Sequence, residues 1–444
     1  MDAEMAGLIS DLQALVRQPS VSAKKQGLIE CAKLVMETMQ RAGINSELLY
    51  LEDKDIPPIV YGEVKSSLNP GKTLLFYNHY DVQPEEPLEL WNDAPFSGKL
   101  EGNLIYGRGS ADDKGELITR IKAVEYFLKK NGDLPCNVKF LVEGEEEIGS
   151  LHIEQYLTKY RDKFLCDGVI WEFGYVDAKD RPIISLGMKG LLYVELTEKG
   201  PSRDAHSSLA VLIDNPAWRL VSALSTMRDD NGRILIKDWY KEVRTFTKEE
   251  LRLISREPFD EKEFKHEYGI TKFVKNARGT DIKKALVGAP TCNIAGFNSG
   301  YIGEGAKTVL PAIATVKIDF RLVPDMVPEK QLRRLKRHLK LRGFGEIEVK
   351  SIHGEAAART PIRHPFVDHV KQAAKEVFGS AITSVSSAGT GPMYSFVKVL
   401  KVPCISIGST YIFARIHSPN EFARVDLLRK TTKCIARIIE RFAS

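Results

Sequence analysis

The sequence lacks long apolar runs. None reaches the roughly 20 residues that a membrane-spanning helix requires. Residues 1–20 form an amphipathic segment that carries acidic residues, and it has no continuous apolar region of the kind found in secretory signal peptides. We therefore expect a protein of the cytoplasm that does not bind membranes.

Closely spaced cysteines are also missing. The six cysteines are scattered, and no C-x-x-C pair is present. A disulfide framework and a cysteine-based zinc site both need regular cysteine spacing, so the sequence argues against either one.

The chain has little excess of one charge. Its 64 Lys and Arg residues nearly balance 59 Asp and Glu residues, which leaves a net charge of +5 over 444 residues. The densest basic run, 333–338, has helical spacing and is interpreted as a solvated helix face. Nucleic acid is therefore not an expected partner.

At 444 residues the chain is too long for one ordinary core, so two domains are expected. Strand-like and helical segments alternate up to residue 188, and this pattern favours a mixed, mostly parallel sheet covered by helices. The pattern changes near Gly187-Met188-Lys189-Gly190. We predict an α/β catalytic domain formed by 1–188 and 356–444, interrupted by an inserted α/β domain at 189–355.

Helices are expected at 8–18, 28–41, 116–130, 153–160, 328–342, 361–378 and 425–442, with helices and loops over 228–288. Strands are expected at 46–51, 59–64, 73–78, 137–142, 168–171, 191–198, 292–297, 312–322, 347–352 and 404–407.

The stretch from His79 to Gly115 is the first candidate for chemistry. A buried strand is predicted to end at His79-Tyr80-Asp81, where Asp81 can accept the second ring N–H of His79. The stretch ends in a glycine-punctuated turn with Asp112 and Asp113 just before a helix. These two residues could simply cap that helix, but a cap accounts for only one of them.

Further polar residues follow other predicted strands. Glu145-Glu146-Glu147 and Glu172 each follow an apolar strand, and His417 lies in a loop between a strand and a helix. Adjacent carboxylates repel one another unless cations or protons compensate them, although a surface loop could tolerate such a run.

Together these residues match the inventory of a two-metal hydrolase. Imidazole and carboxylate ligands without thiols favour Zn²⁺, with Mn²⁺ or Co²⁺ as alternatives. Two cations roughly 3.5–4 Å apart can share a bridging carboxylate and a bridging water. A further Glu that binds no metal can then move a proton from that water to the leaving amine.

Four motifs carry a family resemblance, in this order along the chain: HYDVQP at 79–84, GRGSADDKG at 107–115, EGEEEIGS at 143–150 and HSPNE at 417–421. The set resembles the cocatalytic-zinc peptidase family M20, which includes aminoacylases, carnosinase-type dipeptidases, succinyl-diaminopimelate desuccinylase and glutamate carboxypeptidase. The stretches at 91–115, 290–312 and 320–326 are most similar to the carnosinase-like branch.

The resemblance implies two metal ions and a role for each matching residue. Asp112 is expected to bridge the two ions, with a cis peptide bond after it. The first ion would be bound by His79 and Glu172, and the second by Glu147 and His417. The resemblance further assigns Asp81 to the orientation of His79 and Glu146 to the general base.

For the inserted domain, the resemblance implies a lid that also carries a homodimer interface. His206 is expected to polarise the scissile carbonyl, often in the partner subunit's site, and Arg321 to bind the substrate carboxylate. A loop histidine and a salt-bridged strand residue are their ordinary alternatives. Thr308, His353 and Thr390 match substrate-contacting positions more loosely.

These expectations combine into metal-dependent hydrolysis of an amide bond in a dipeptide or short peptide, next to a free C-terminal carboxylate. Glu172 departs from the pattern, because dipeptidase members tend to carry Asp there and aminoacylase and carboxypeptidase members Glu. An N-acyl amino acid deacylase is therefore the alternative. A non-catalytic binding relative is disfavoured, since every motif position is filled.

Overall fold

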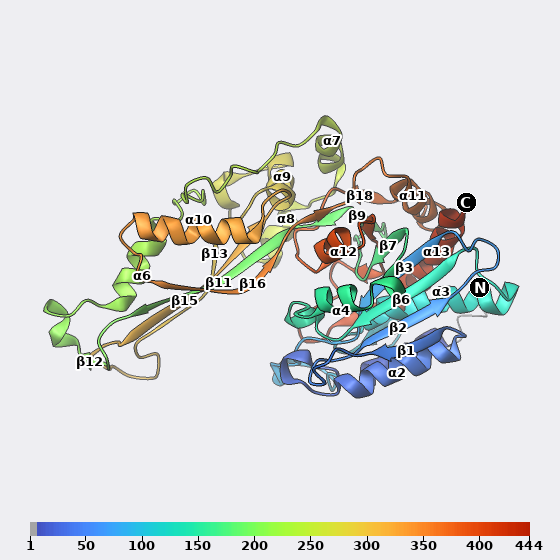
Figure 1. The fold of residues 1–444 in the computed structure, drawn as a ribbon, viewed down its shortest axis with the longest axis horizontal. Coiled ribbons are helices and arrows are strands. Elements are labelled where there is room, and N and C mark those ends of the chain that lie inside the picture. Colours follow the sequence, from blue (N-terminus) through green and yellow to red (C-terminus); the bar gives the residue numbers. More distant parts are fainter. Residues whose placement is uncertain (1–6) are drawn as a thin grey trace. The chain divides into compact units, whose positions relative to one another are not determined.

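The computed structural model describes residues 7–444, which form two compact units. Figure 1 shows the element order along the chain. The first unit contains residues up to Gly187 together with Arg359–Ser386 and Gly391–Ser444, and the second contains Met188–Ala358 with Ser387–Thr390. The chain leaves the first unit in β10 (Gly187–Met188) and returns to it in β17 (Ala358–Arg359).

The first unit is built on an eight-stranded sheet in the order β1-β2-β6-β3-β7-β19-β9-β18. The strands are β1 Asn45–Leu49, β2 Ile59–Val64, β3 Thr73–His79, β6 Asn137–Glu143, β7 Gly168–Trp171, β9 Ile183–Ser185, β18 Ile382–Ser384 and β19 Cys404–Ser406. The four pairs β6–β3, β3–β7, β7–β19 and β9–β18 are parallel, and the other three are antiparallel. The predicted mixed, mostly parallel sheet is confirmed.

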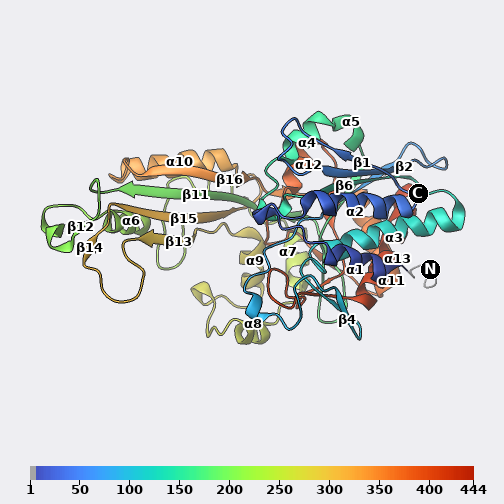
Figure 2. The ribbon, with the colours of Figure 1, turned by 90° about the horizontal axis from the view of Figure 1, so that it is seen from below.

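Helices cover both faces of this sheet. They are α1 Leu8–Arg17, α2 Leu28–Arg41, α3 Lys114–Asn131, α4 Ile153–Lys159, α5 Arg161–Phe164, α11 Pro365–Phe378, α12 Met393–Val399 and α13 Val425–Ala443. Figure 2 shows α1, α3 and α13 side by side, and their apolar side chains share one core with those of α2 and α11. α4, α5 and α12 pack on the opposite face.

Side chains of the central strand β3 point alternately to the two faces of the sheet, and apolar ones occur on both. Leu74 and Phe76 of β3 point into the larger core, whereas Tyr77 points to the other face. There the Tyr77 ring lies 4.3 Å from Trp171 and 4.7 Å from Phe396 of α12, measured between ring centroids. Because β3 is buried on both faces, its sequence reads as an almost continuous apolar run.

Short strands complete the first unit. β21 (Phe422–Arg424), β5 (Leu104–Tyr106) and β4 (Lys99–Glu101) form one small sheet, and β20 (Thr410–Tyr411) pairs with β8 (Tyr175–Val176).

The second unit contains an antiparallel sheet in the order β13-β15-β11-β16. Its strands are β11 Gly190–Lys199, β13 Asn293–Ser299, β15 Ile313–Leu322 and β16 Glu348–Glu355, and β12 (Ala205–His206) pairs separately with β14 (Val309–Leu310). Figure 2 shows α10 (Pro328–Leu341) alongside β11 and β16, and α6 (Pro216–Ser225) packs on β11 and β15. This is the expected α/β inserted domain.

The charged stretch 228–288 consists of helices and loops, as expected. It contains α7 (Lys248–Arg256), α8 (Glu261–Glu267) and α9 (Thr280–Gly288). Thr247 and Glu250 form a capping box that starts α7.

The basic run of α10 is less solvated than predicted, because Arg334 pairs with Glu242 at 2.5 Å and His338 is buried.

Residues 387–390 belong to the second unit, although the sequence placed them in the first. The backbone N–H of Lys189 donates to the carbonyl of Gly389 at 3.0 Å, and the Arg321 guanidinium donates to Thr390 Oγ1 at 2.7 Å.

All six cysteines are free. Over residues 7–444, no helix is long and apolar enough to cross a membrane.

Candidate metal centre

The candidate site lies at the carboxyl ends of neighbouring strands of the first unit. β3 ends at His79, which is opposite Glu143 at the end of β6, and β7 is followed by Glu172. Glu146 and Glu147 follow β6 in a short 3₁₀ turn. Parallel strands end at the same edge of a sheet, so these polar side chains converge there.

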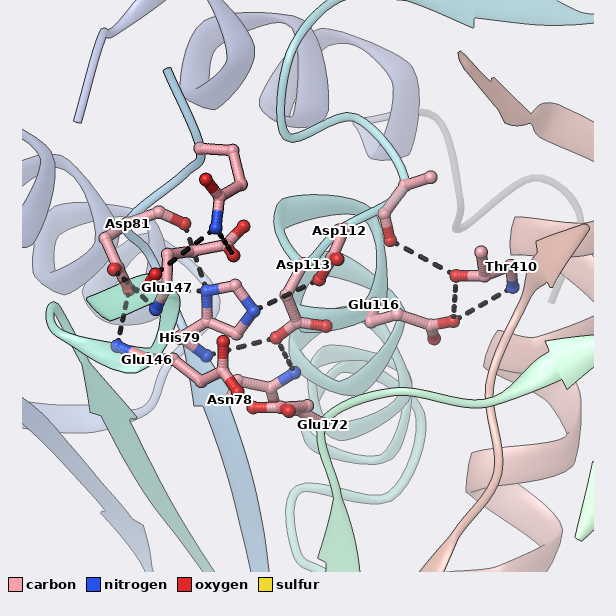
Figure 3. A network of polar contacts seen from close by, with 12 residues as sticks. Asn78, His79, Asp81, Asp112, Asp113, Glu116, Glu146, Glu147, Glu172 and Thr410 are labelled. Atoms are coloured by element: carbon pink, nitrogen blue, oxygen red, sulfur yellow. Dashed lines mark hydrogen bonds and ion pairs between the residues drawn. The ribbon is translucent and has the colours of Figure 1, made fainter. Parts of the chain in front are cut away.

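Asp112 lies between the two histidines. Its Oδ1 is 3.2 Å from His79 Nε2, and its Oδ2 is 3.1 Å from His417 Nε2. Figure 3 shows Asp112 beside the His79 ring. One carboxylate thus faces two imidazoles that are 338 residues apart in the sequence. The peptide bond between Asp112 and Asp113 is cis, as expected.

Two groups of side chains have the geometry to hold a cation. Each group offers ligand atoms within 4.8 Å of one another: His79 with Asp113 and Glu172, and Asp112 with Glu147 and His417. The contact between His79 and Asp112 connects the two groups. The five residues expected to bind metal are therefore brought together.

Asp113 is the member of these groups to which the sequence assigned no metal-binding role. It stands at the N-cap position of α3, but its side chain does not cap that helix. Asp113 Oδ2 instead accepts hydrogen bonds from Asn78 Nδ2 at 2.6 Å and from the backbone N–H of His79 at 3.1 Å. The cap interpretation is wrong for this side chain.

Asp81 contacts both His79 and the loop after β6. His79 Nδ1 lies 3.0 Å from the Asp81 carbonyl and 3.3 Å from its Oδ1, so a proton on Nδ1 leaves Nε2 with a free lone pair. The Asp81 carboxylate also accepts the backbone N–H groups of Glu146 and Glu147, at 3.2 and 3.0 Å.

Glu172 is held through its backbone by a buried arginine of α3. Arg120 Nη2 donates to the carbonyl oxygens of Glu172, Trp171 and Ile407, at 2.7, 3.1 and 3.1 Å. Its Nη1 pairs with Glu116 at 2.7 Å. The sequence alone did not single out this pair, because an i,i+4 Glu–Arg pair on a helix is ordinarily a surface feature.

The electrostatics of the site favour cations. Burial raises the pKa of Asp113, Glu146 and Glu172 well above the usual carboxyl values, and repulsion between Glu146 and Glu172 adds to the effect. Asp113 Oδ1 and Glu172 Oε2 are buried with no hydrogen-bond partner. Crowded carboxylates with unpartnered oxygens fit divalent cations, which would compensate the negative charge.

Neighbouring carboxylates raise the pKa values of both histidines. Hydrogen bonds with Asp112 and then Glu147 raise the pKa of His417 to about 10. Burial opposes the positive charge of His79, but Asp112 and Asp81 still raise its pKa well above the usual value. Although burial works in the opposite direction, the two rings lower the pKa of Asp112.

The other five expected site residues lie in the second unit, and four of them form two pairs. Thr308 Oγ1 lies 3.4 Å from Nε2 of the exposed His206, whose Nδ1 contacts the Ser208 hydroxyl at 2.8 Å. Arg321 donates to Thr390, as described above. Among residues 7–444, neither Arg321 nor its buried neighbour Lys189 makes an ion pair with an acidic residue. Burial, and then the positive charge of Arg321, lower the pKa of Lys189 to about 8.

His353 lies on β16 opposite Tyr193 of β11. Arg321 is opposite Leu191 of the same strand, two residues away, so Arg321 and His353 share the sheet face that α6 and α10 leave open.

Comparison with known proteins agrees with this geometry. Residues 75–441 match the model of peptidase family M20/M25/M40. The chain belongs to this family. It is 28% identical to the Cys-Gly metallodipeptidase of Schizosaccharomyces pombe over 467 aligned positions, which cover 100% of this chain and 97% of the relative. It is 27% identical to the human β-Ala-His dipeptidase, over 89% of this chain and 81% of the relative.

Among solved structures, the M20 family metallo-carboxypeptidase Sso-CP2 from Sulfolobus solfataricus matches with a TM-score of 0.93 and 40% identity over the full length of both chains. Human carnosine dipeptidase 1 matches with a TM-score of 0.83 and 26% identity, over 100% of this chain and 98% of the other. As a member of the M20/M25/M40 family, the chain is a hydrolase of the metallopeptidase type, similar to dipeptidases and a carboxypeptidase. The resemblance read from the four motifs is confirmed.

Proposed function

We propose that the chain hydrolyses the amide bond of a dipeptide or short peptide next to a free C-terminal carboxylate, with the help of two divalent metal ions. The observation that carries this proposal is the Asp112 carboxylate, whose two oxygens face His79 and His417 from 3.2 and 3.1 Å. A carboxylate in this position can serve two cations at once.

Each group of side chains would hold one cation. His79 and Glu172 would bind the first, Glu147 and His417 the second, and Asp112 would be shared. Asp113 Oδ1 is a further oxygen available to the first. Imidazole and carboxylate ligands suit Zn²⁺, with Mn²⁺ or Co²⁺ as alternatives. When bound, such cations lower the pKa of water towards neutrality and polarise a carbonyl group.

Glu146 is the proposed general base. Its backbone N–H donates to Asp81, and burial, with the nearby charges of Glu147 and Asp112, raises the pKa of its carboxylate. It belongs to neither group of candidate ligands. Glu146 therefore accepts a proton from the attacking water and returns it to the departing amine.

Residues of the second unit are proposed to bind the substrate. Arg321, with no acidic partner and with Thr390 at 2.7 Å, would bind the free carboxylate, for which a guanidinium is geometrically suited. His206 would donate to the oxyanion that develops on the scissile carbonyl. Thr308 contacts His206, and His353 lies on the same sheet face as Arg321. We assign both to substrate contact.

The relatives support a peptide substrate, since they are Cys-Gly and β-Ala-His dipeptidases and a carboxypeptidase. The alternative is an N-acyl amino acid deacylase on the same fold, and one residue favours it: Glu172 stands where dipeptidase-like members tend to carry Asp.

The choice between them is tested by release of free amino acid from three kinds of substrate, namely dipeptides, the same dipeptides amidated at the C-terminus, and N-acetyl or N-succinyl amino acids. We expect hydrolysis of free dipeptides with at least tenfold lower kcat/KM for the amides. Faster hydrolysis of the N-acyl amino acids would favour the deacylase, and no hydrolysis of any substrate by metal-loaded protein would contradict both.

We further propose a homodimer formed through the second unit. Trp218 and Val221 of α6 are exposed, Trp218 by 69%, and β13 is an edge strand with exposed Ile294 and Phe297. Exposed apolar edges and patches mark association surfaces. Sedimentation equilibrium should give twice the chain mass, and Trp218→Glu should shift it towards the monomer.

A further inference from the structure

A buried ion pair lies between the turn that carries Asp112 and the loop that carries His417. Arg108 Nη1 donates to Glu421 Oε2 at 2.7 Å, and both residues are only 1% exposed. The two residues are 313 positions apart in the chain. They come from two of the four sequence motifs, but the mechanism proposed above uses neither of them.

The second oxygen of Glu421 is bound to the backbone of the Asp112 turn. Glu421 Oε1 accepts the N–H groups of Ala111 at 3.0 Å and of Asp112 at 3.1 Å. The Glu421 carbonyl in turn accepts the N–H of Gly107 at 2.9 Å. The carboxylate of Glu421 therefore fixes the backbone from which the Asp112 side chain projects.

Arg108 extends this connection to two other loops. Its Nη1 also lies 3.4 Å from the carbonyl oxygen of Ser418, the residue after His417. Its Nη2 donates to the carbonyl of Pro84 at 3.2 Å, in the loop that follows His79. One guanidinium thus contacts the segments that carry three candidate ligands.

We infer that the Arg108–Glu421 pair is a positioning device, which sets the Asp112 carboxylate against His417 and thereby lets Asp112 serve two cations. A buried ion pair is a poor choice for stability alone, because apolar residues of similar volume often do as well. This pair occurs where three chain segments must keep a fixed spacing. His417 itself has φ +57°, a left-handed conformation that its surroundings must maintain. The inference rests on the proposed function.

The test compares two isosteric substitutions, Glu421→Gln and Asp177→Asn. Asp177 is a matched control in the same unit: it is 6% exposed, one oxygen accepts the N–H groups of Lys179 and Arg181 at 2.9 Å, and the other accepts the Arg181 guanidinium at 2.6 Å. It contacts no candidate ligand. Metal-free protein is titrated with Co²⁺, and affinity, stoichiometry and the visible spectrum of the bound ion are measured.

We expect Glu421→Gln to weaken Co²⁺ binding at least tenfold at one site or both and to change the visible spectrum, because residues behind metal ligands typically affect affinity by about 10–100-fold. Asp177→Asn should lower the thermal midpoint of the metal-free protein while leaving Co²⁺ affinity within about threefold of wild type.

Wild-type affinity and spectrum in folded Glu421→Gln would overturn the inference, as would an equal loss of affinity in Asp177→Asn. If Glu421→Gln does not fold, Arg108→Lys is measured in its place, with the same expected and contradicting results. Its ammonium group keeps the positive charge but cannot reach the oxygen atoms of Glu421, Ser418 and Pro84 at once. Failure of the wild-type protein to bind Co²⁺ would contradict the proposed function itself.

Discussion

Replacing Asp112 with asparagine should weaken both metal sites at once. The substitution keeps the shape of the side chain but removes the charge shared between His79 and His417, which lie 3.2 and 3.1 Å from its two oxygens. Its amide nitrogen must also face one of the two rings, where a carboxylate oxygen now lies. In contrast, Glu172→Gln alters only the group that contains His79 and Asp113.

The size of the effect follows from this shared position. Substitution of a residue that only supports a metal ligand typically weakens metal affinity about 10–100-fold. Loss of a charged ligand itself should weaken it at least as much as the upper value. About 100-fold at each site corresponds to about 2.7 kcal/mol per site, or about 5.5 kcal/mol for two. Glu172→Gln should lose about 2.7 kcal/mol in total, at one site.

The assay is a titration of metal-free protein with Co²⁺ in competition with a chromophoric chelator. Two weakened binding constants are expected for Asp112→Asn and one for Glu172→Gln. If Asp112→Asn weakened only one site, Asp112 would be a terminal ligand and the bridging assignment would be refuted. If it weakened neither, both groups would be wrongly assigned.

Three further predictions concern catalysis and pH. Glu146→Gln should lower kcat by about 10²–10⁴-fold while two ions remain bound, since the residue moves a proton and binds no metal; retained activity would reject it as the base. Because Asp112 and Glu147 raise the pKa of His417 to about 10, its ring is protonated near neutral pH and a cation must displace that proton. Co²⁺ affinity should therefore rise between about pH 6.5 and 8.5, by up to about tenfold per pH unit for each proton released, and a flat profile would contradict this. Arg321→Ala should raise KM for free dipeptides at least about tenfold but not for C-terminally amidated ones; equal effects on both would argue against carboxylate binding.

Local patterns predicted most of the regular elements. Helix α2 begins and ends where its apolar spacing and the following Gly43 indicate, and β7 has the bounds expected from its short apolar run. α12 and β18, which have seven and three residues, were not predicted. The position of β19 between β7 and β9 depends on long-range pairing that no local pattern encodes.

The site was predictable to the extent that its residues lie in recognisable motifs. Asp113 was missed because its neighbour Asn78 lies 35 residues earlier, and nothing near Asp113 distinguishes it from a helix cap. Arg120 was missed for a related reason, since its contacts at the ends of β7 and β19 exist only after those strands pair. Thr390 was placed in the wrong unit, because its hydrogen bond to Arg321 spans 69 residues.

Amide hydrolysis by this chain is proposed to depend on two metal ions held by these two groups of side chains. The most direct test is to remove all metal with a chelator, titrate the protein with Zn²⁺, and follow hydrolysis of a free dipeptide together with bound zinc per chain. We predict no activity without metal and a maximum at two ions per chain. Full activity of the metal-free protein, or no activity at any zinc content, would contradict the account.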